Sequence, residues 1–234
     1  MSTAIITGIG SGIGRAVAIE LSIRGYYDKF ALLGRNVEAI QDTISEMRRN
    51  GAGHISFYPI DLSEPEKLPE IVRMIEKSEG DIAALYNIAG YTDPQPLFAT
   101  TLESFELTYK VNVFAPFMLM REVAKYMRAT GGRILNVAST AGMTPRPGWL
   151  SYASSKSSVI AMSKTLTAEL AEYGIKVYCV SPGRCATKLR RRLAPDEDPS
   201  TIMQPEEVAE VICDLMNPKE CCLDGQNIVI RKQI

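Results

Sequence analysis

The chain has 234 residues, 26 basic and 27 acidic side chains, and a formal net charge of −1, so no general electrostatic attraction to nucleic acid or to an anionic membrane is expected. No apolar run reaches the roughly 18 residues that a membrane-spanning helix needs, and we expect no signal peptide before the first strand. A single histidine and an odd number of cysteines without metal-ligand spacing argue against zinc chemistry and favour a reducing, cytoplasmic setting, and the length fits one α/β domain over residues 1–234.

The first predicted unit is a short apolar strand at residues 3–7, a glycine-rich loop at 8–14 and a helix at 15–24. The loop has the spacing Thr-Gly-x-x-x-Gly-x-Gly, and the common Gly-x-Gly-x-x-Gly spacing fails there. Glycines let the backbone approach a pyrophosphate, whose charge is favoured by the free N–H groups and the dipole of a helix N-terminus. The unit therefore predicts a nucleotide site, with an ordinary turn as the alternative.

A second strand, residues 29–33, leads into Gly34, Arg35 and Asn36. A ribose with a free 2′-hydroxyl usually meets an acidic side chain in this region, whereas an arginine pairs with a 2′-phosphate. Arg35 therefore favours NADP(H) over NAD(H). Alternatively, Arg35 is a solvated residue before a helix at 37–50.

Two further strands are predicted at residues 54–60 and 82–86, with a helix led by Ser63-Glu64-Pro65 between them. Asp61 follows the first of these strands, where it could accept a hydrogen bond from an adenine amino group or serve as a turn residue. The second leads into the segment 87–90. Strands that alternate with helices predict a doubly wound parallel sheet, whose sites lie at the carboxyl ends of the strands.

The next predicted helix, residues 102–128, contains Asn112 and, four residues later, Pro116. Proline has no N–H, so the Asn112 carbonyl loses its usual helical partner. We expect a bend here, with a carbonyl free to hold water; a plain proline kink is the alternative.

A buried strand with Ile134, Leu135 and Val137 ends near Ser139, and Pro145, Pro147 and Gly148 then interrupt regular structure. A helix predicted over residues 152–173 follows.

Tyr152 and Lys156 are four residues apart and so share one face of this helix. An ammonium group one turn away favours a phenolate, so we expect Lys156 to lower the pKa of Tyr152 and make it a usable acid or base. Ser139 could hold a substrate oxygen on which charge develops. This chemistry fits exchange between a carbonyl and an alcohol, although Tyr-x-x-x-Lys alone is also a common chance spacing.

The last third of the chain predicts a strand at 175–180, then Ser181-Pro182-Gly183, a polar segment at 184–204, a helix from Pro205 and a strand at 226–230. The polar segment contains several arginines and an acidic cluster. We interpret it as a mobile lid over a pocket, with a solvated surface as the alternative.

These motifs together resemble the short-chain dehydrogenase/reductase family over essentially the whole chain. Its glycine motif matches residues 7–14, and its Asn-Asn-Ala-Gly is similar to residues 87–90, with Ile88 in place of the second asparagine. The resemblance implies a Rossmann-like doubly wound domain with a seven-stranded parallel sheet. It also implies the catalytic tetrad Asn112, Ser139, Tyr152 and Lys156.

In this family Tyr152 would give its proton to the carbonyl oxygen, Ser139 would position that oxygen, Lys156 would bind the nicotinamide ribose, and the Asn112 carbonyl would anchor a water. We predict that the dinucleotide contacts Gly8, Ser11, Gly12, Ile13, Gly14, Arg35, Asn36, Asp61, Leu62, Asn87, Ala89, Gly90, Tyr152, Lys156, Pro182, Gly183, Cys185 and Thr187. Two departures stand out. Ile88 should alter only local sheet support, and Cys185 replaces a branched aliphatic residue near the nicotinamide.

The leading hypothesis is an NADPH-dependent oxidoreductase that interconverts a carbonyl and a secondary alcohol in a small molecule, similar to the 3-oxoacyl-[acyl-carrier-protein] reductases. Small ketones, steroids or sugars are alternative substrates, and a non-catalytic NADP(H)-binding regulator is an alternative function. Neither nucleic acid nor a membrane is an expected partner. The helices at 102–128 and 152–173 could form the contact of a homodimer or homotetramer, as in relatives.

Overall fold

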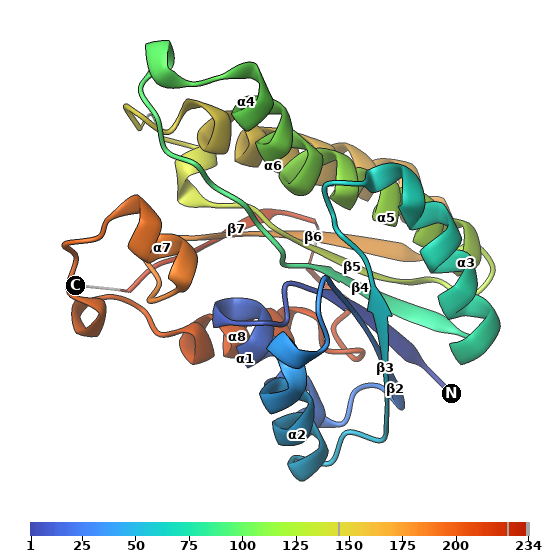
Figure 1. The fold of residues 1–234 in the computed structure, drawn as a ribbon. Coiled ribbons are helices and arrows are strands. Elements are labelled where there is room, and N and C mark those ends of the chain that lie inside the picture. Colours follow the sequence, from blue (N-terminus) through green and yellow to red (C-terminus); the bar gives the residue numbers. More distant parts are fainter. Residues whose placement is uncertain (145, 224, 233–234) are drawn as a thin grey trace.

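The computed structural model describes residues 1–144, 146–223 and 225–232, and its centre is a seven-stranded sheet (Figure 1). The order of the strands is β3-β2-β1-β4-β5-β6-β7, and each neighbouring pair is parallel. Their bounds are β1 (Thr3–Thr7), β2 (Lys29–Gly34), β3 (His54–Pro59), β4 (Ile82–Asn87), β5 (Gly132–Val137), β6 (Ile175–Pro182) and β7 (Asn227–Ile230). The predicted parallel, doubly wound sheet is confirmed. Pro145, which was expected to interrupt regular structure, lies outside the described residues.

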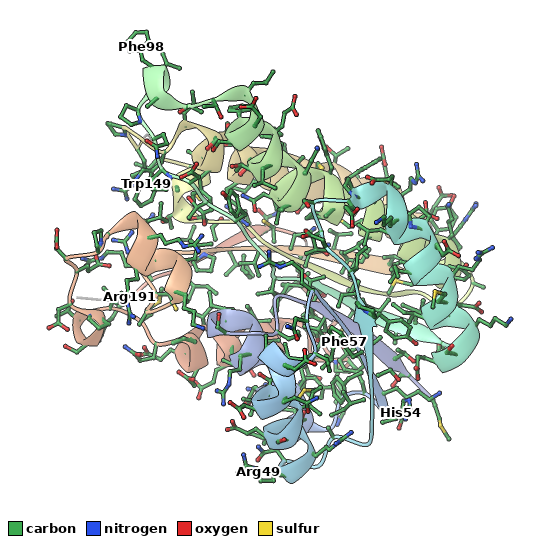
Figure 2. The ribbon with its side chains drawn as sticks, in the orientation of Figure 1. Arg49, His54, Phe57, Phe98, Trp149 and Arg191 are labelled. Atoms are coloured by element: carbon green, nitrogen blue, oxygen red, sulfur yellow. The ribbon has the colours of Figure 1, made fainter. Side chains whose placement is uncertain are left out.

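Helices cover both faces of the sheet (Figure 1). On one face lie α1 (Gly12–Arg24), α2 (Gln41–Arg49) and α8 (Pro205–Leu215); on the other lie α3 (Leu68–Glu79), α4 (Leu102–Tyr109), α5 (Ala115–Met127) and α6 (Leu150–Leu170). Side chains fill the space between the sheet and the helices on both faces (Figure 2), and a separate apolar core forms on each face. Burial on both sides explains why β1 is a continuous apolar run, all five of whose residues are buried. In the described parts of the chain, no helix combines the length and apolarity needed to cross a membrane.

The order of the strands reverses at β1, which lies between β2 and β4. The buried Thr7 joins the carboxyl ends of β1 and β4, because its Oγ1 accepts hydrogen bonds from the N–H groups of Ile88 (3.0 Å) and Ala89 (3.1 Å). A crevice outside such a reversal is where ligands bind in open parallel sheets. The fold therefore brings the glycine loop and the segment after β4 to one place.

The helix predicted over residues 102–128 is divided, which corrects its expected continuity. A π-helical turn, Lys110–Phe114, separates α4 from α5, and Pro116 lies in the first turn of α5. The interruption falls where the bend was predicted. Inserting a π turn shifts the residues that follow around the helix axis, and such turns are frequent at functional sites. Here the turn contains the fully buried Asn112.

The polar segment 184–204 folds over the carboxyl rim of the sheet as the short helix α7 (Lys188–Leu193) and a 3₁₀ turn, Pro199–Thr201. Arg190 closes the segment on itself, because its Nε and Nη2 donate to the Glu197 carboxylate at 2.6 and 2.7 Å. A β-bridge between Cys185 and Met203 joins its two ends. The mobility of this lid remains a prediction. The final helix, α8, begins at Pro205 as predicted.

Candidate active site

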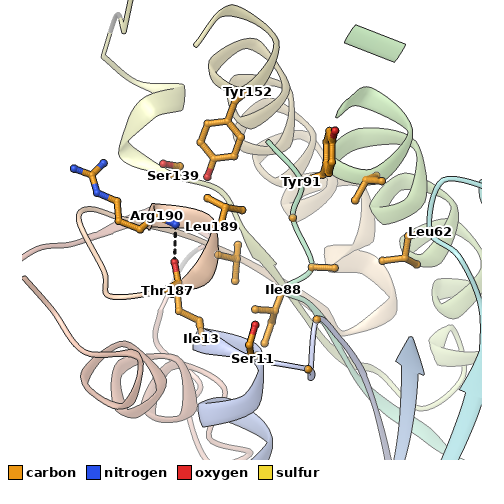
Figure 3. A pocket seen from close by; sticks show the side chains of 18 of the residues that line it. Ser11, Ile13, Leu62, Ile88, Tyr91, Ser139, Tyr152, Thr187, Leu189 and Arg190 are labelled. Atoms are coloured by element: carbon orange, nitrogen blue, oxygen red, sulfur yellow. Dashed lines mark hydrogen bonds between the residues drawn. The ribbon is translucent and has the colours of Figure 1, made fainter. Parts of the chain in front are cut away.

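A cavity of about 900 Å³ follows the carboxyl ends of the strands (Figure 3). It gathers segments that are far apart in the sequence, from the glycine loop after β1 to α7. All of the predicted site residues except Asn87 and Asn112 line it, namely Gly8, Ser11, Gly12, Ile13, Gly14, Arg35, Asn36, Asp61, Leu62, Ala89, Gly90, Ser139, Tyr152, Lys156, Pro182, Gly183, Cys185 and Thr187.

The two exceptions lie behind the wall of the cavity. Asn87 donates from Nδ2 to the Oδ1 of Asn136 on the neighbouring strand at 2.9 Å. The side chain of Asn112 accepts from the N–H of Tyr91 at 2.8 Å and donates to the carbonyl of Tyr91 at 2.9 Å and to the Oγ of Ser155 at 3.0 Å. The Asn112 amide is therefore committed to holding the wall together, which leaves its main chain for any part in the chemistry, whereas the buried Oδ1 of Asn87 has no partner among the described residues.

The glycine loop has the geometry that a phosphate site requires. Gly8 and Gly12 have φ values of +78° and +58°, a region that other residues rarely adopt. A Cβ on Gly14 would come less than 3.0 Å from the carbonyl of Gly8, so this glycine is needed where α1 packs against the loop. Ser11 precedes α1 without capping it through its side chain, so the N–H groups of the first turn have no side-chain acceptor from Ser11. The loop thus fits a pyrophosphate group.

Arg35 and Asp61 lie at the far end of the cavity, after β2 and β3. Asp61 Oδ1 accepts from the N–H of Ser63 at 2.9 Å, and this hydrogen bond is the main cause that lowers the pKa of Asp61. Asn36 Oδ1 accepts from the N–H of Glu38 at 2.7 Å. Asp61 and Asn36 therefore use one oxygen each for turns, and the Arg35 guanidinium is the cation at this end of the cavity.

Tyr152, from the first turn of α6, points its hydroxyl into the cavity toward Ser139 (Figure 3). Ser139 follows β5 and caps the 3₁₀ turn Thr140–Gly142 by accepting from the N–H of Ala141 at 3.1 Å. Ser157 ties that turn to α6 by donating from Oγ to the carbonyl of Gly142 at 2.6 Å. The two hydroxyl groups therefore meet because the turn after β5 is fastened to the helix that carries Tyr152.

The expected cause of a lowered Tyr152 pKa is wrong for this structure. Burial raises the pKa of Tyr152, while the nearby Ser139 hydroxyl and the charge of Arg190 oppose that rise. Lys156 lies 5.9 Å from the centre of the Tyr152 ring, and its Nζ donates to the carbonyl of Val137 at 2.7 Å. The ammonium group is thus directed at the end of β5 and not at the phenol oxygen.

Lys156 is itself strongly perturbed, since only 3% of it is exposed. Loss of hydration lowers its pKa from 10.5 to about 8. Between these values the unfolded chain binds more protons than the folded protein, so the contribution of this group to the free energy of unfolding increases as the pH rises from about 8 to 10.5. Below pH 8 the cost of burying the charged form is fully present.

Denaturant unfolding of the wild type and Lys156→Met across this pH window tests this assignment. The difference in stability, wild type minus variant, should grow by roughly 3 kcal/mol toward high pH. Lys164→Met, which removes an exposed lysine two turns further along α6, is the matched control. A flat difference for Lys156→Met would contradict the lowered pKa.

The comparisons with known proteins agree with this geometry. A family model described as short chain dehydrogenase matches residues 2–198. The chain belongs to the short-chain dehydrogenase family.

Among its relatives is a 2,3-dihydro-2,3-dihydroxybenzoate dehydrogenase of Bacillus subtilis, 36% identical over 83% of this chain and 74% of the relative. Another is the 3-oxoacyl-[acyl-carrier-protein] reductase FabG of Thermotoga maritima, 30% identical over 97% of this chain and 94% of the relative. A solved structure described as ElxO with NADP bound has a TM-score of 0.84 and 28% identity, covering 98% of this chain and 96% of that chain. The chain is therefore an oxidoreductase of a family whose members bind NAD(P)(H).

The two departures from the family pattern have a clear place in this short-chain dehydrogenase. Ile88 lines the cavity and packs into the core beside α1. The expectation that Ile88 alters only local sheet support was therefore too narrow. Cys185 is 4% exposed, and burial raises the pKa of its thiol to about 12. Cys185 therefore acts as a small apolar wall residue. Among the residues that the structure describes, no group of His, Cys, Asp or Glu could hold a metal ion.

The sequence analysis missed the wall around Tyr152. Tyr91, Arg146, Trp149, Leu189 and Arg190 all line this part of the cavity. They come from three separate loops and helices, and none belongs to a periodic pattern or to a spaced motif. The one available signal was the position of Arg146 and Trp149 just before Tyr152, in the loop predicted between the strand that ends near Ser139 and the helix that carries Tyr152.

The segment after β6 runs between the two ends of the cavity. Thr187 lies against Gly12 at the glycine loop, where a Cβ on that glycine would approach Thr187 Cγ2 to 2.9 Å. The N–H of Arg190 donates to Thr187 Oγ1 at 3.0 Å, and its guanidinium lies near Trp149 at the other end (Figure 3). One short helix thus forms a wall for both halves of the site.

Proposed function

We propose that this short-chain dehydrogenase is an NADPH-dependent oxidoreductase that interconverts a carbonyl and a secondary alcohol. The observation that supports the proposal is the Tyr152 hydroxyl, which points toward Ser139 inside a cavity that continues to a glycine loop fitted to a dinucleotide. When bound, the dinucleotide supplies or accepts the hydride. The protein must then bind the substrate oxygen and move one proton at it.

Tyr152 is the proton donor in the direction of reduction. Its hydroxyl and that of Ser139 converge on one point, so a carbonyl oxygen there accepts from both. Ser139 stabilises the negative charge that develops on this oxygen, while the proton passes from Tyr152. Because burial raises the pKa of Tyr152, the phenol stays protonated before it transfers its proton to the substrate oxygen.

Lys156 acts as a buried cation at the end of β5. Its Nζ is directed to the carbonyl of Val137, and a Cβ on Gly90 would lie 3.7 Å from Nζ, so the ammonium group lies beside the segment after β4. In this position its remaining N–H donors are available to ribose hydroxyls.

Asn112 supports proton supply through its main chain. Because its side chain is occupied by Tyr91 and Ser155, and Pro116 cannot donate to its carbonyl, the π turn leaves the carbonyl able to hold a water. Such a water would return a proton to Tyr152 after each turnover.

We infer a preference for NADP(H) from Arg35, whose guanidinium suits a 2′-phosphate. Arg35→Ala is expected to weaken NADPH binding about 10–100-fold and NADH binding much less, because one charge-assisted contact is lost. Fluorescence titration of both cofactors measures this. Arg49→Ala, an exposed arginine of α2 outside the cavity, is the matched control. Equal losses for both cofactors would contradict the assignment.

For the substrate, we infer 3-oxoacyl thioesters as the first candidates, in line with the FabG relative, and hydroxylated cyclic acids as the second, in line with the dihydroxybenzoate dehydrogenase relative. Oxidation of NADPH with a panel of carbonyl compounds tests the proposal. Turnover of at least one compound is expected. Tight NADPH binding without any turnover would contradict the enzymatic role and favour a cofactor-binding regulator.

We also infer a homodimer or homotetramer built on the helices of one face. Phe114, at the end of the π turn, and Phe117 on α5 are 47% and 44% exposed. Exposed aromatic side chains on a helix favour burial against another copy. Light scattering coupled to gel filtration measures the mass, and a monomer would contradict this inference.

A further inference from the structure

Trp149, the only tryptophan of the chain, lies beside the proposed proton donor. Its ring centre is 6.4 Å from that of Tyr152, in an edge-on arrangement. Two guanidinium groups lie near the same ring, Arg146 at 6.0 Å and Arg190 at 5.8 Å from its centre. A substrate whose carbonyl meets Tyr152 therefore has an aromatic surface and two cations within reach.

The two arginines differ in what they already bind. Arg190 is held by both oxygens of Glu197, and only 19% of its side chain is exposed. Arg146 is exposed at the mouth of the cavity and makes no ion pair or side-chain hydrogen bond with any residue that the structure describes. Its five N–H donors are thus free of protein acceptors there, whereas those of Arg190 are partly used.

The cavities around Arg146 contain further basic side chains, of which Arg184 and Arg190 are paired with Glu197. A second cavity of about 520 Å³ shares Arg146 and Arg184 with the main one, and it is further lined by Arg231 and Lys232. Among the residues that the structure describes, no Asp or Glu lines this second cavity, and Asp61 of the main cavity lies at the nucleotide end. Clefts lined by one sign of charge concentrate ligands of the opposite sign.

The phosphates of the dinucleotide do not account for this charge. Under the proposed function they lie at the glycine loop and at Arg35, which are reached through the opposite end of the cavity. Arg146 is separated from them by Tyr152 and Ser139, where the reaction occurs. An anion at Arg146 therefore has to belong to the other reactant.

We propose that the substrate carries an anionic group, a carboxylate or a phosphate, that Arg146 binds while Trp149 covers the adjoining apolar part. This rests on the proposed function, since it assigns the other end of the same molecule whose carbonyl meets Tyr152. A guanidinium binds either anion through two parallel N–H donors, and the neighbouring ring limits its freedom to turn away.

Benzoate, phenyl phosphate and benzamide, titrated at fixed ionic strength with and without NADP⁺, test the proposal. The three compounds share one ring and differ in charge. Trp149 fluorescence reports binding at this position, because the chain has no other tryptophan. We expect benzoate or phenyl phosphate to bind at least about 10-fold more tightly than benzamide, and the tighter of the two anions identifies the group.

Arg146→Met should remove this preference, because the affinity for the anion should fall by about 10–100-fold. Arg191→Met is the matched control, since Arg191 is an exposed residue of α7 that lines neither cavity, and it should keep the preference. Equal binding of all three compounds, or a preference that survives in Arg146→Met, would overturn the proposal. The readout needs no turnover, so failure of the carbonyl panel and failure of this test are distinct results.

Discussion

Replacing Tyr152 with phenylalanine is expected to lower kcat by about 10²–10⁴-fold, because the substrate oxygen then loses its proton donor. The ring itself stays, still packed edge-on against Trp149. Ser139 keeps its hydrogen bond from the N–H of Ala141, so the turn after β5 has no reason to move. NADPH affinity and melting temperature should therefore change little while turnover collapses.

Steady-state kinetics with a compound from the carbonyl panel, alongside NADPH titration, measures the two effects separately. Tyr126→Phe removes the same atom from a partly exposed tyrosine of α5 and serves as the control. A Tyr152→Phe enzyme that turns over at more than a tenth of the wild-type rate would assign the proton transfer to another group, and the proposed mechanism would fall.

Among single Gly→Ala substitutions in the glycine loop, Gly14→Ala should lower stability and NADPH binding the most. Its Cβ would come closer than 3.0 Å to the carbonyl of Gly8, and that neighbour is backbone, which cannot rotate away as a side chain can. Overpacking of this kind costs about 1–3 kcal/mol, which corresponds to a fall in melting temperature of roughly 2–4 °C for each kcal/mol in a chain of this size. We also expect NADPH binding to be lost, because α1 must move away from the loop to admit the methyl group.

Gly10→Ala provides the comparison within the same loop. A Cβ there would have its nearest neighbour at 3.8 Å, which is an ordinary contact. Its melting temperature should stay within about 2 °C of the wild type, since open positions tolerate such changes within about 0.5 kcal/mol. Thermal unfolding of both variants decides the matter, and equal melting temperatures would show that α1 is less tightly packed than the structure indicates.

The position of a residue could be predicted from the sequence where it is part of a local sequence pattern, but not where it depends on long-range contacts. Strands such as β1 and β5 are short apolar runs bounded by glycine or polar residues, so their existence and parallel pairing follow from the sequence. Because every parallel strand ends at the same rim, the positions of Arg35 and Ser139 in the cavity follow as well. The role of Gly12 and Gly14 could also be predicted, because the tight glycine loop is set by local backbone geometry.

Properties that arise from long-range packing were beyond such reasoning. The pKa of Tyr152 depends on its burial and on Arg190, which is 38 residues away along the chain, and neither is visible in a Tyr-x-x-x-Lys spacing. The places of Asn87 and Asn112 behind the wall likewise depend on partners far along the chain, Asn136 and Ser155. Arg146 and Trp149 sit in an irregular loop, where no periodicity marks a residue as facing a cavity.

Under the proposed function, the segment that contains Thr187 and α7 is expected to couple the binding of the two ligands. Thr187 contacts Gly12 of the glycine loop, and the Arg190 guanidinium, one turn later, lies near the Trp149 ring. Binding of the first ligand orders this helix at a cost in conformational entropy. The second ligand then binds to a helix that is already ordered, so each ligand should raise the affinity of the other by the same factor.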